Sequence, residues 1–308
     1  YMISNSNPWD NLKFDLEGVE EVQRKFFGTL FNTYSFLSLY ANIDGFKNEE
    51  KPISLIERSE LDQWILSELN TLIAMVDSFY QDYEPTKAAR SISDFVQEKL
   101  SNWYIRLCRR RFWKGNYEKD KIAAYQTLYE CLFIVSKLIA PIAPFFADYL
   151  YKNLTKNTFS EKFESVHLSD FPSSKKEFIN IRLESQINTA RNITSLALSL
   201  RKKEQIKVRQ PLETLIIALN NIEEKEEIEM IKSQVASEVN VKKIEFINDK
   251  SDIIVKEIKP NFKTLGPKYG REMSSVISVI NTFSATEIKT LEDEGEISIK
   301  LNEKNIIL

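Results

Sequence analysis

Residues 85–113 read PTKAARSISDFVQEKLSNWYIRLCRRRFW, and the spacing of their apolar side chains predicts one long helix. Pro85 suits the first turn of a helix, because its missing N–H would have no partner there. The core-facing positions recur three or four residues apart, at Ile92, Val96, Leu100, Trp103 and Leu107. This helix therefore presents one apolar stripe to a core and ends in a run of arginines.

Three other segments repeat this periodicity. Apolar stripes run from Val19 to about Ala41, from Leu61 to Tyr80, and from about Lys119 to Ile139, ahead of Pro141 and Pro144. Ser59 precedes the second stripe and fits an N-cap. Four long amphipathic helices joined by short loops predict a helical bundle over residues 19–155.

The second half of the chain has a different texture. Residues 156–210 read as a connecting loop followed by a helix from about Ile179 to Lys203. Beyond them, short apolar runs predict strands of a small sheet at 212–219, 243–247, 252–258 and 296–301. Helices are expected near 225–235 and 271–283. The predicted fold class is mainly α, with a helical bundle followed by a smaller α+β domain over residues 211–308.

Composition excludes several classes of protein. With 308 residues, a net charge of −3 and a pI near 5.6, the chain is not a wholly basic nucleic-acid coat protein. A site for a polyanion must then be a local patch. Its 7 glycines form no GxGxxG or GxxxxGK loop for phosphates. Two distant cysteines and one histidine cannot supply a four-ligand zinc site, so no metal is predicted.

Residues 101–115, SNWYIRLCRRRFWKG, form the most basic patch of the bundle, and no acidic residue lies between Glu98 and Glu118. Guanidinium forks pair with phosphate oxygens, and aromatic rings stack on unpaired bases. Trp103 is assigned to the core and Cys108 to a buried thiol. The candidate RNA-binding side chains of this patch are Arg106, Arg109, Arg110, Arg111, Phe112, Trp113 and Lys114.

A second basic patch follows the later helix. Only Glu204 opposes its positive charges, which are Arg201, Lys202, Lys203, Lys207 and Arg209. Cations at a helix C-terminus also complement the helix dipole and form salt bridges, so a purely structural role stays open. Two such patches in a net-acidic protein favour an RNA-binding helical module. No catalytic constellation competes with this hypothesis, and His167 is expected to be a solvated loop residue.

Several segments resemble isoleucyl-tRNA synthetases, which are class I aminoacyl-tRNA synthetases. The segments are PWDNLKFD (8–15), FFGTLFNTYSFLSLYANIDGF (26–46), SELDQWILSELN (59–70), YEPTKAARSISDFV (83–96), LSNWYIRLCRRRFWKG (100–115), KIAAYQTLYECL (121–132), LIAPIAPFFADYLY (138–151), KVRQPL (207–212) and FKTLGPKYGREM (262–273). The resemblance covers nearly the whole chain, and the RRRFW run favours the isoleucyl member over related enzymes.

The resemblance implies a role in ATP-dependent charging of isoleucine onto its tRNA in the cytoplasm. The chain would be the anticodon-binding region, with residues 1–18 as the junction to a catalytic domain. It holds no HIGH or KMSKS motif and no editing domain, so this piece should be non-catalytic and need no cofactor. The resemblance implies ATP and Mg²⁺, with zinc in some relatives, for the parent ligase only.

The expected partners are isoleucine tRNA and the catalytic and editing domains of the same ligase, with no membrane and no DNA. An 18-residue uninterrupted apolar run is absent from the sequence, which argues against a membrane span. Two alternatives remain open at this stage. The chain could be a helical scaffold for protein partners, or the same region of a related class I enzyme such as the valyl one.

Overall fold

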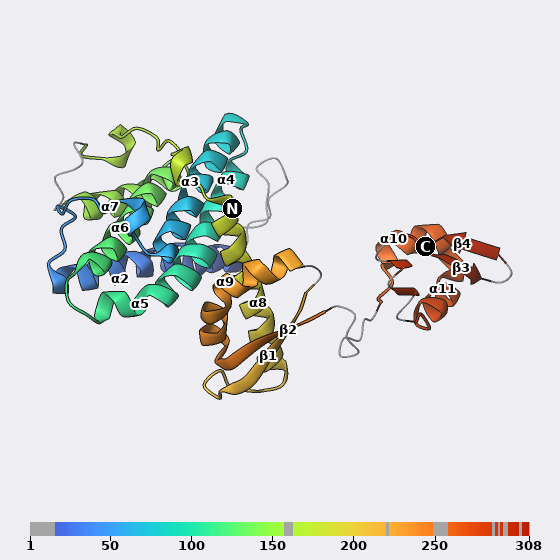
Figure 1. Cartoon of the computed structure of the whole chain (residues 1–308). Helices are drawn as coiled ribbons and strands as arrows, with labels where there is room; N and C mark the ends of the chain where they lie inside the picture. The colour runs from blue at the N-terminus through green and yellow to red at the C-terminus, as the bar shows by residue number, and fades with distance from the viewer. Residues whose placement is uncertain are drawn as a thin grey trace. The chain divides into compact units, whose positions relative to one another are not determined.

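The computed structural model describes residues 16–156, 163–219, 222–248, 258–284, 287–288, 290–291, 295–301 and 304–307. The chain divides into two compact units (Figure 1). One unit holds the chain up to Val208 together with Ile231–Val239, and the other holds Arg209–Met230 with Asn240–Leu308. The domain boundaries given by the sequence remain a proposal.

The first unit contains the predicted helical bundle. Its first helix runs without a break through α1 (Leu16–Val22), η1 (Gln23–Phe27) and α2 (Gly28–Asp44). The second is α3 (Glu60–Gln81), the third is formed by α4 (Pro85–Asp94), η3 (Phe95–Ile105) and α5 (Arg106–Trp113), and the fourth is α6 (Lys119–Ile139). The backbone N–H of Asp62 donates to the side chain of Ser59, which confirms the N-cap of α3. Pro85 lies in the first turn of α4, as predicted.

The third helix departs from the predicted stripe at one position. Its buried face runs through Val96, Leu100, Tyr104, Cys108 and Phe112, so the spacing is four residues throughout. Trp103 is buried as predicted, but Leu107 is only half-buried. The cause is η3, a π-helical segment whose i→i+5 hydrogen bonds place more residues in each turn. The core-facing positions therefore shift one residue toward the C-terminus.

A fifth bundle helix was missing from the prediction. Pro144 was taken as a break, yet it occupies the first turn of α7 (Pro144–Thr155), where a proline is tolerated. In the described part of the chain, α6 alone is long and apolar enough to pass a composition test for a membrane span. Most of that window (72%) is buried inside the bundle, which is typical of a central core helix.

Helix α8 (Ile181–Lys203) packs on α3 and is joined to it by partly buried polar contacts. The hydroxyl of Ser67 donates to Glu184 and accepts the backbone N–H of Asn180 at 2.7 Å. Thr71 donates to the same carboxylate at 2.9 Å. These contacts fix the start of α8 against the middle of α3.

The second unit begins with two strands joined by a helix whose later half, Ile231–Val239, belongs to the first unit. Strand β1 (Leu212–Leu219) pairs in parallel with β2 (Val241–Asn248), and α9 (Ile222–Val239) connects them. The later part contains α10 (Phe262–Tyr269), η6 (Gly270–Glu272) and α11 (Met273–Ile280). It ends in an antiparallel pair, β3 (Ser298–Leu301) with β4 (Lys304–Ile307).

The predicted mainly α class with a small α+β part is confirmed, but the single predicted sheet is wrong. The strands form two separate two-stranded sheets within the described residues. Helix α10 and strand β4 were not predicted, because Pro267 and the short, polar Lys304–Ile307 segment weaken their patterns. The expected strand at 252–258 lies outside the described residues, apart from Ile258.

Candidate nucleic-acid interface

The C-terminal end of the third helix presents an exposed edge of positive charge. Arg109, Arg110 and Lys114 are all exposed, and Trp113 stands beside them with 53% of its surface accessible. Among the described residues, no ion pair or hydrogen bond engages the three cationic side chains. They are therefore available to phosphate, and the indole is available to a base. We call Arg109, Arg110, Trp113 and Lys114 the α5 edge.

Arg106 lies at the start of α5 but is already engaged. Its Nη1 is 2.6 Å from the Oε2 of Glu238, in the part of α9 that belongs to the same compact unit. Its guanidinium carbon also lies 5.2 Å from the ring centroid of Trp103, within range of a cation–π contact. A phosphate would have to compete with Glu238 for this side chain.

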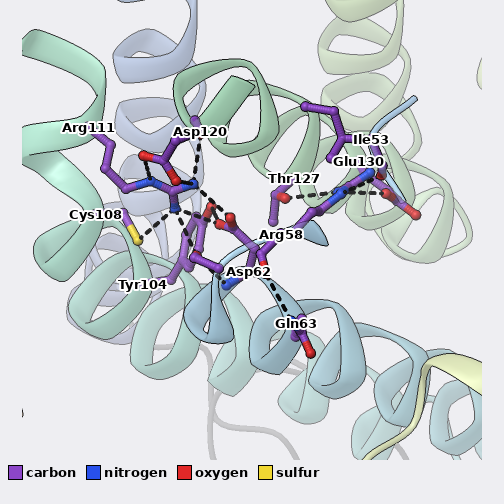
Figure 2. A network of polar contacts seen from close by, with 11 residues as sticks. Ile53, Arg58, Asp62, Gln63, Tyr104, Cys108, Arg111, Asp120, Thr127 and Glu130 are labelled. Atoms are coloured by element: carbon purple, nitrogen blue, oxygen red, sulfur yellow. Dashed lines mark hydrogen bonds and ion pairs between the residues drawn. The ribbon is translucent and has the colours of Figure 1, made fainter. Parts of the chain in front are cut away.

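Arg111 is an internal clamp rather than a surface residue (Figure 2). Its two terminal nitrogens donate to the two carboxylate oxygens of Asp62, both at 2.8 Å, in a bidentate pair. Nε and Nη2 donate to the Asp120 side chain at 2.9 and 2.8 Å, and Nη2 also reaches the Asp120 carbonyl at 2.8 Å. Nη1 further contacts Ser59 Oγ at 3.2 Å and Cys108 Sγ at 3.6 Å. All three nitrogens are used within the protein.

The structure therefore places Arg111 inside the bundle and not on the α5 edge. Its partner Asp62 is fully buried, and Tyr104 donates a further hydrogen bond to that carboxylate at 2.6 Å. Burial alone would lower the pKa of the guanidinium, but the hydrogen bonds and charge of Asp62 raise it overall. Burial, reinforced by Asp62, raises the pKa of Tyr104. The guanidinium of Arg111 therefore stays charged and the phenol of Tyr104 stays neutral across the neutral range, as a structural clamp requires.

Arg58 forms a second clamp next to the first, as Figure 2 shows. Its Nε donates to the carbonyl of Ile53 at 3.0 Å and its Nη1 donates to Thr127 Oγ1 at 2.9 Å. Glu130 completes the site at 3.6 Å, and burial raises the pKa of this carboxyl despite the nearby guanidinium. Gln63 donates to the Arg58 carbonyl at 2.9 Å. The two clamps hold the loop before α3 and the start of α3 against α5 and α6.

Phe112 is the second residue of the patch that the structure reassigns. Only 1% of its surface is exposed, and its ring meets Phe36 and Tyr125 edge-to-face at 5.0 and 5.1 Å. A fully packed ring has no free face for a base, so the structure places Phe112 in the core and not on the α5 edge. The shift caused by η3 brings Phe112 into the core and leaves Trp113 outside.

The second basic patch also divides into exposed cations and one buried arginine. Lys202, Lys203, Lys207 and Arg209 are exposed around the C-terminal end of α8. Arg201 is buried and donates to the backbone carbonyl of Lys207 at 3.2 Å, so it closes the turn after the helix. Arg201 is therefore not among the exposed cations at this end of α8.

Sequence periodicity could not find the partners of the clamps, since Asp62 and Asp120 lie 49 and 9 residues from Arg111. A partial signal existed in the spacing of Ser59 and Asp62, which is typical of the first turn of a helix. In the structure the carboxylate of Asp62 points to Arg111 instead of capping its own helix. Contacts between helices decide which arginine is buried.

Comparison with protein families connects this geometry to a known class. Residues 62–216 match the family described as "Anticodon-binding domain of tRNA ligase". The chain belongs to this family. The matched region contains α4 to α8 and nearly all of α3, and so it includes Arg111 with Asp62 and Asp120, the α5 edge and the basic end of α8, whereas Arg58 lies just before it.

Individual relatives that match this chain are isoleucine–tRNA ligases. The chain is 52% identical over 302 residues to an isoleucine–tRNA ligase of Bacteroides thetaiotaomicron, which covers 98% of this chain and 26% of that protein. It is 53% identical over 301 residues to the enzyme of Porphyromonas gingivalis, with the same coverage. The enzyme of Cytophaga hutchinsonii is 49% identical over 307 residues, which are 28% of its length. The chain thus spans about a quarter of the length of these ligases.

Proposed function

We propose that this chain is the tRNA-binding region of an isoleucine–tRNA ligase and that it binds isoleucine tRNA through the α5 edge. The observation that carries the proposal is the coincidence of the anticodon-binding family match with exposed cations that have no ion pair within the described part of the chain and lie next to an exposed indole. The relatives named above are all isoleucine–tRNA ligases. ATP and Mg²⁺ would act in parts of such a ligase outside this chain.

The chemistry of the α5 edge suits a single-stranded loop of RNA. Arg109 and Arg110 offer guanidinium forks to phosphate oxygens, and Lys114 adds a point charge. Trp113 offers a ring face to an unpaired base, a contact that contributes roughly 1–3 kcal/mol per base. Lys202 and Lys203 at the end of α8 would extend the phosphate contacts. The internal clamps keep the α5 edge in a fixed conformation, which lowers the ordering cost of binding.

The proposal is tested by titrating the 308-residue chain with isoleucine tRNA and, in parallel, valine tRNA at several salt concentrations. If about five phosphates are neutralised, the logarithm of the binding constant falls with the logarithm of salt at a slope near −3.5 to −4.5. Preferential binding of isoleucine tRNA supports the proposal. Equal binding would move discrimination to other parts of the ligase, and absence of binding at low salt would favour a protein-interaction scaffold.

A further inference from the structure

Helices α2 and α7 carry aromatic side chains on faces that the bundle core does not use. On α2 the buried positions are Leu30, Thr33 and Leu37, whereas Phe31 and Tyr34 lie on the adjacent face. Phe31 has 44% of its surface exposed, and its ring lies 6.4 Å from that of Tyr34. Positions on the outer face of a bundle helix are usually polar, so this aromatic stripe needs a separate explanation.

The same departure is stronger on α7. Its core face consists of Ala147, Leu150, Tyr151 and Leu154. Phe145 is 91% exposed and Tyr149, one turn along, is 50% exposed. Exposed aromatic rings that gather on one face mark an interaction surface more often than isolated apolar residues do.

Helices α2 and α7 meet at one end and line a common cleft at the other, and we call the space between them the groove. The rings of Phe27 and Phe146 meet edge-to-face at 5.2 Å, which joins the two helices at one end. Farther along, a cleft of about 220 Å³ is lined by one face of α2 from Tyr34 to Asn42, by Tyr129 of α6, and by Asn153 and Leu154 of α7. Because the low-numbered residues of both helices meet at one end and the high-numbered ones at the other, the helices run in the same direction. Phe31 is then level with Tyr149.

We propose that this groove is the docking site for another segment of the same ligase polypeptide. The proposal rests on the proposed function. The isoleucine–tRNA ligases that match this chain have about three quarters of their length outside the matched region, so such a ligase supplies the further polypeptide that the proposal needs. A groove between two parallel helices accepts an amphipathic helix whose apolar side chains are spaced three and four residues apart.

The chemistry of the groove changes along its length. Near Phe31 and Tyr149 the rim is aromatic, which suits aliphatic and aromatic anchors. At the other end the cleft is lined by asparagines and by Lys47 and Lys156, with no carboxylate among its described lining residues. The segment that docks here is therefore apolar at the end near Tyr149 and acidic at the end near Lys156.

Hydroxyl-radical footprinting with mass spectrometry tests this directly. The oxidation rates of Phe145 and Tyr149 are compared in the 308-residue chain and in a full-length isoleucine–tRNA ligase that contains it. The rates fall by about fivefold or more in the full-length enzyme, because a specific interface excludes water from its core. Tyr83, which is 89% exposed at the turn between α3 and α4, is the matched control and reacts equally in both. Equal rates for Phe145 and Tyr149 in both proteins would overturn the proposal.

Two further readouts separate the possible outcomes. If the two rings become protected in the 308-residue chain as its concentration rises, the occupant is a second copy and the proposal is wrong. The variant Phe145→Ser with Tyr149→Ser leaves tRNA binding by the 308-residue chain unchanged, since the α5 edge is untouched. If the unmodified 308-residue chain does not bind tRNA, the proposed function is refuted while the oxidation rates of Phe145 and Tyr149 are unaffected. Failure of the proposed function and failure of the docking proposal can therefore be told apart.

Discussion

Replacing Arg111 by alanine should destabilise the bundle far more than replacing its neighbour Arg110. Without the guanidinium, the fully buried carboxylate of Asp62 loses its bidentate partner, and among the described residues the hydroxyl of Tyr104 is the donor that remains. Breaking a buried pair in this way costs about 3–5 kcal/mol. The exposed pair with Asp120 adds at most about 1 kcal/mol. For a unit of this size the loss corresponds to a fall in melting temperature of roughly 6–20 °C.

The assay is urea denaturation followed by fluorescence of the buried indoles Trp64 and Trp103. Arg110→Ala serves as the control and changes stability by less than about 0.5 kcal/mol, because its side chain is exposed and not ion-paired in the described structure. Adding Asp62→Asn to Arg111→Ala recovers part of the loss, since the unpaired charge is then removed. If Arg111→Ala is as stable as the unmodified chain but no longer binds tRNA, the clamp interpretation is refuted.

Three other predictions follow from burial and charge. Phe112→Ala lowers the free energy of unfolding by about 3–5 kcal/mol. Trp113→Ala leaves the free energy of unfolding nearly unchanged but weakens tRNA binding by about 1–3 kcal/mol. Urea titration and tRNA binding of both variants check this. Neither Cys108, whose pKa burial raises to about 12, nor Cys131 reacts with Ellman's reagent at neutral pH, and both react after unfolding. Hydrogen bonds from a lysine one turn along and from a serine lower the pKa of Asp148 in the folded chain to about 2. The stabilisation that the ionised carboxylate gives to the folded state is therefore complete above its pKa in the unfolded chain, near 3.9, and is lost as the pH falls toward 2. Asp148→Asn should therefore lower the melting temperature at neutral pH and have no effect near pH 2.

Much of the bundle could be predicted from the sequence, because its local signals agree with the tertiary structure. Ser59 and Pro85 mark helix starts by chemistry that depends only on the adjacent residues. The long apolar stripes of α3 and α6 also needed no knowledge of their partners. Pro144 shows the limit, since a proline that begins a helix and one that ends a helix look alike until the next turn is known.

The candidate site could be predicted as a segment but not residue by residue. The π-helical stretch shifts the core face by one residue, and this small rotation buries Phe112 and leaves Trp113 exposed. A further consequence is that Arg111 points to Asp62 while Arg109 and Arg110 point outward. Arginines that are adjacent in sequence thus take different roles through contacts with residues distant in sequence, which periodicity alone cannot reveal.

The most direct test of the account is isoleucine tRNA binding by the double variant Arg109→Ala with Arg110→Ala, measured across a range of salt concentrations. The matched control removes two other exposed arginines, Arg24 and Arg182. We predict that the first variant binds at least about tenfold more weakly, with a salt slope smaller by about 1.4–1.8, while helical circular dichroism is unchanged. The control should bind within about threefold of the unmodified chain. Equal affinity and equal slope for the two variants would contradict the central claim that the α5 edge holds the RNA.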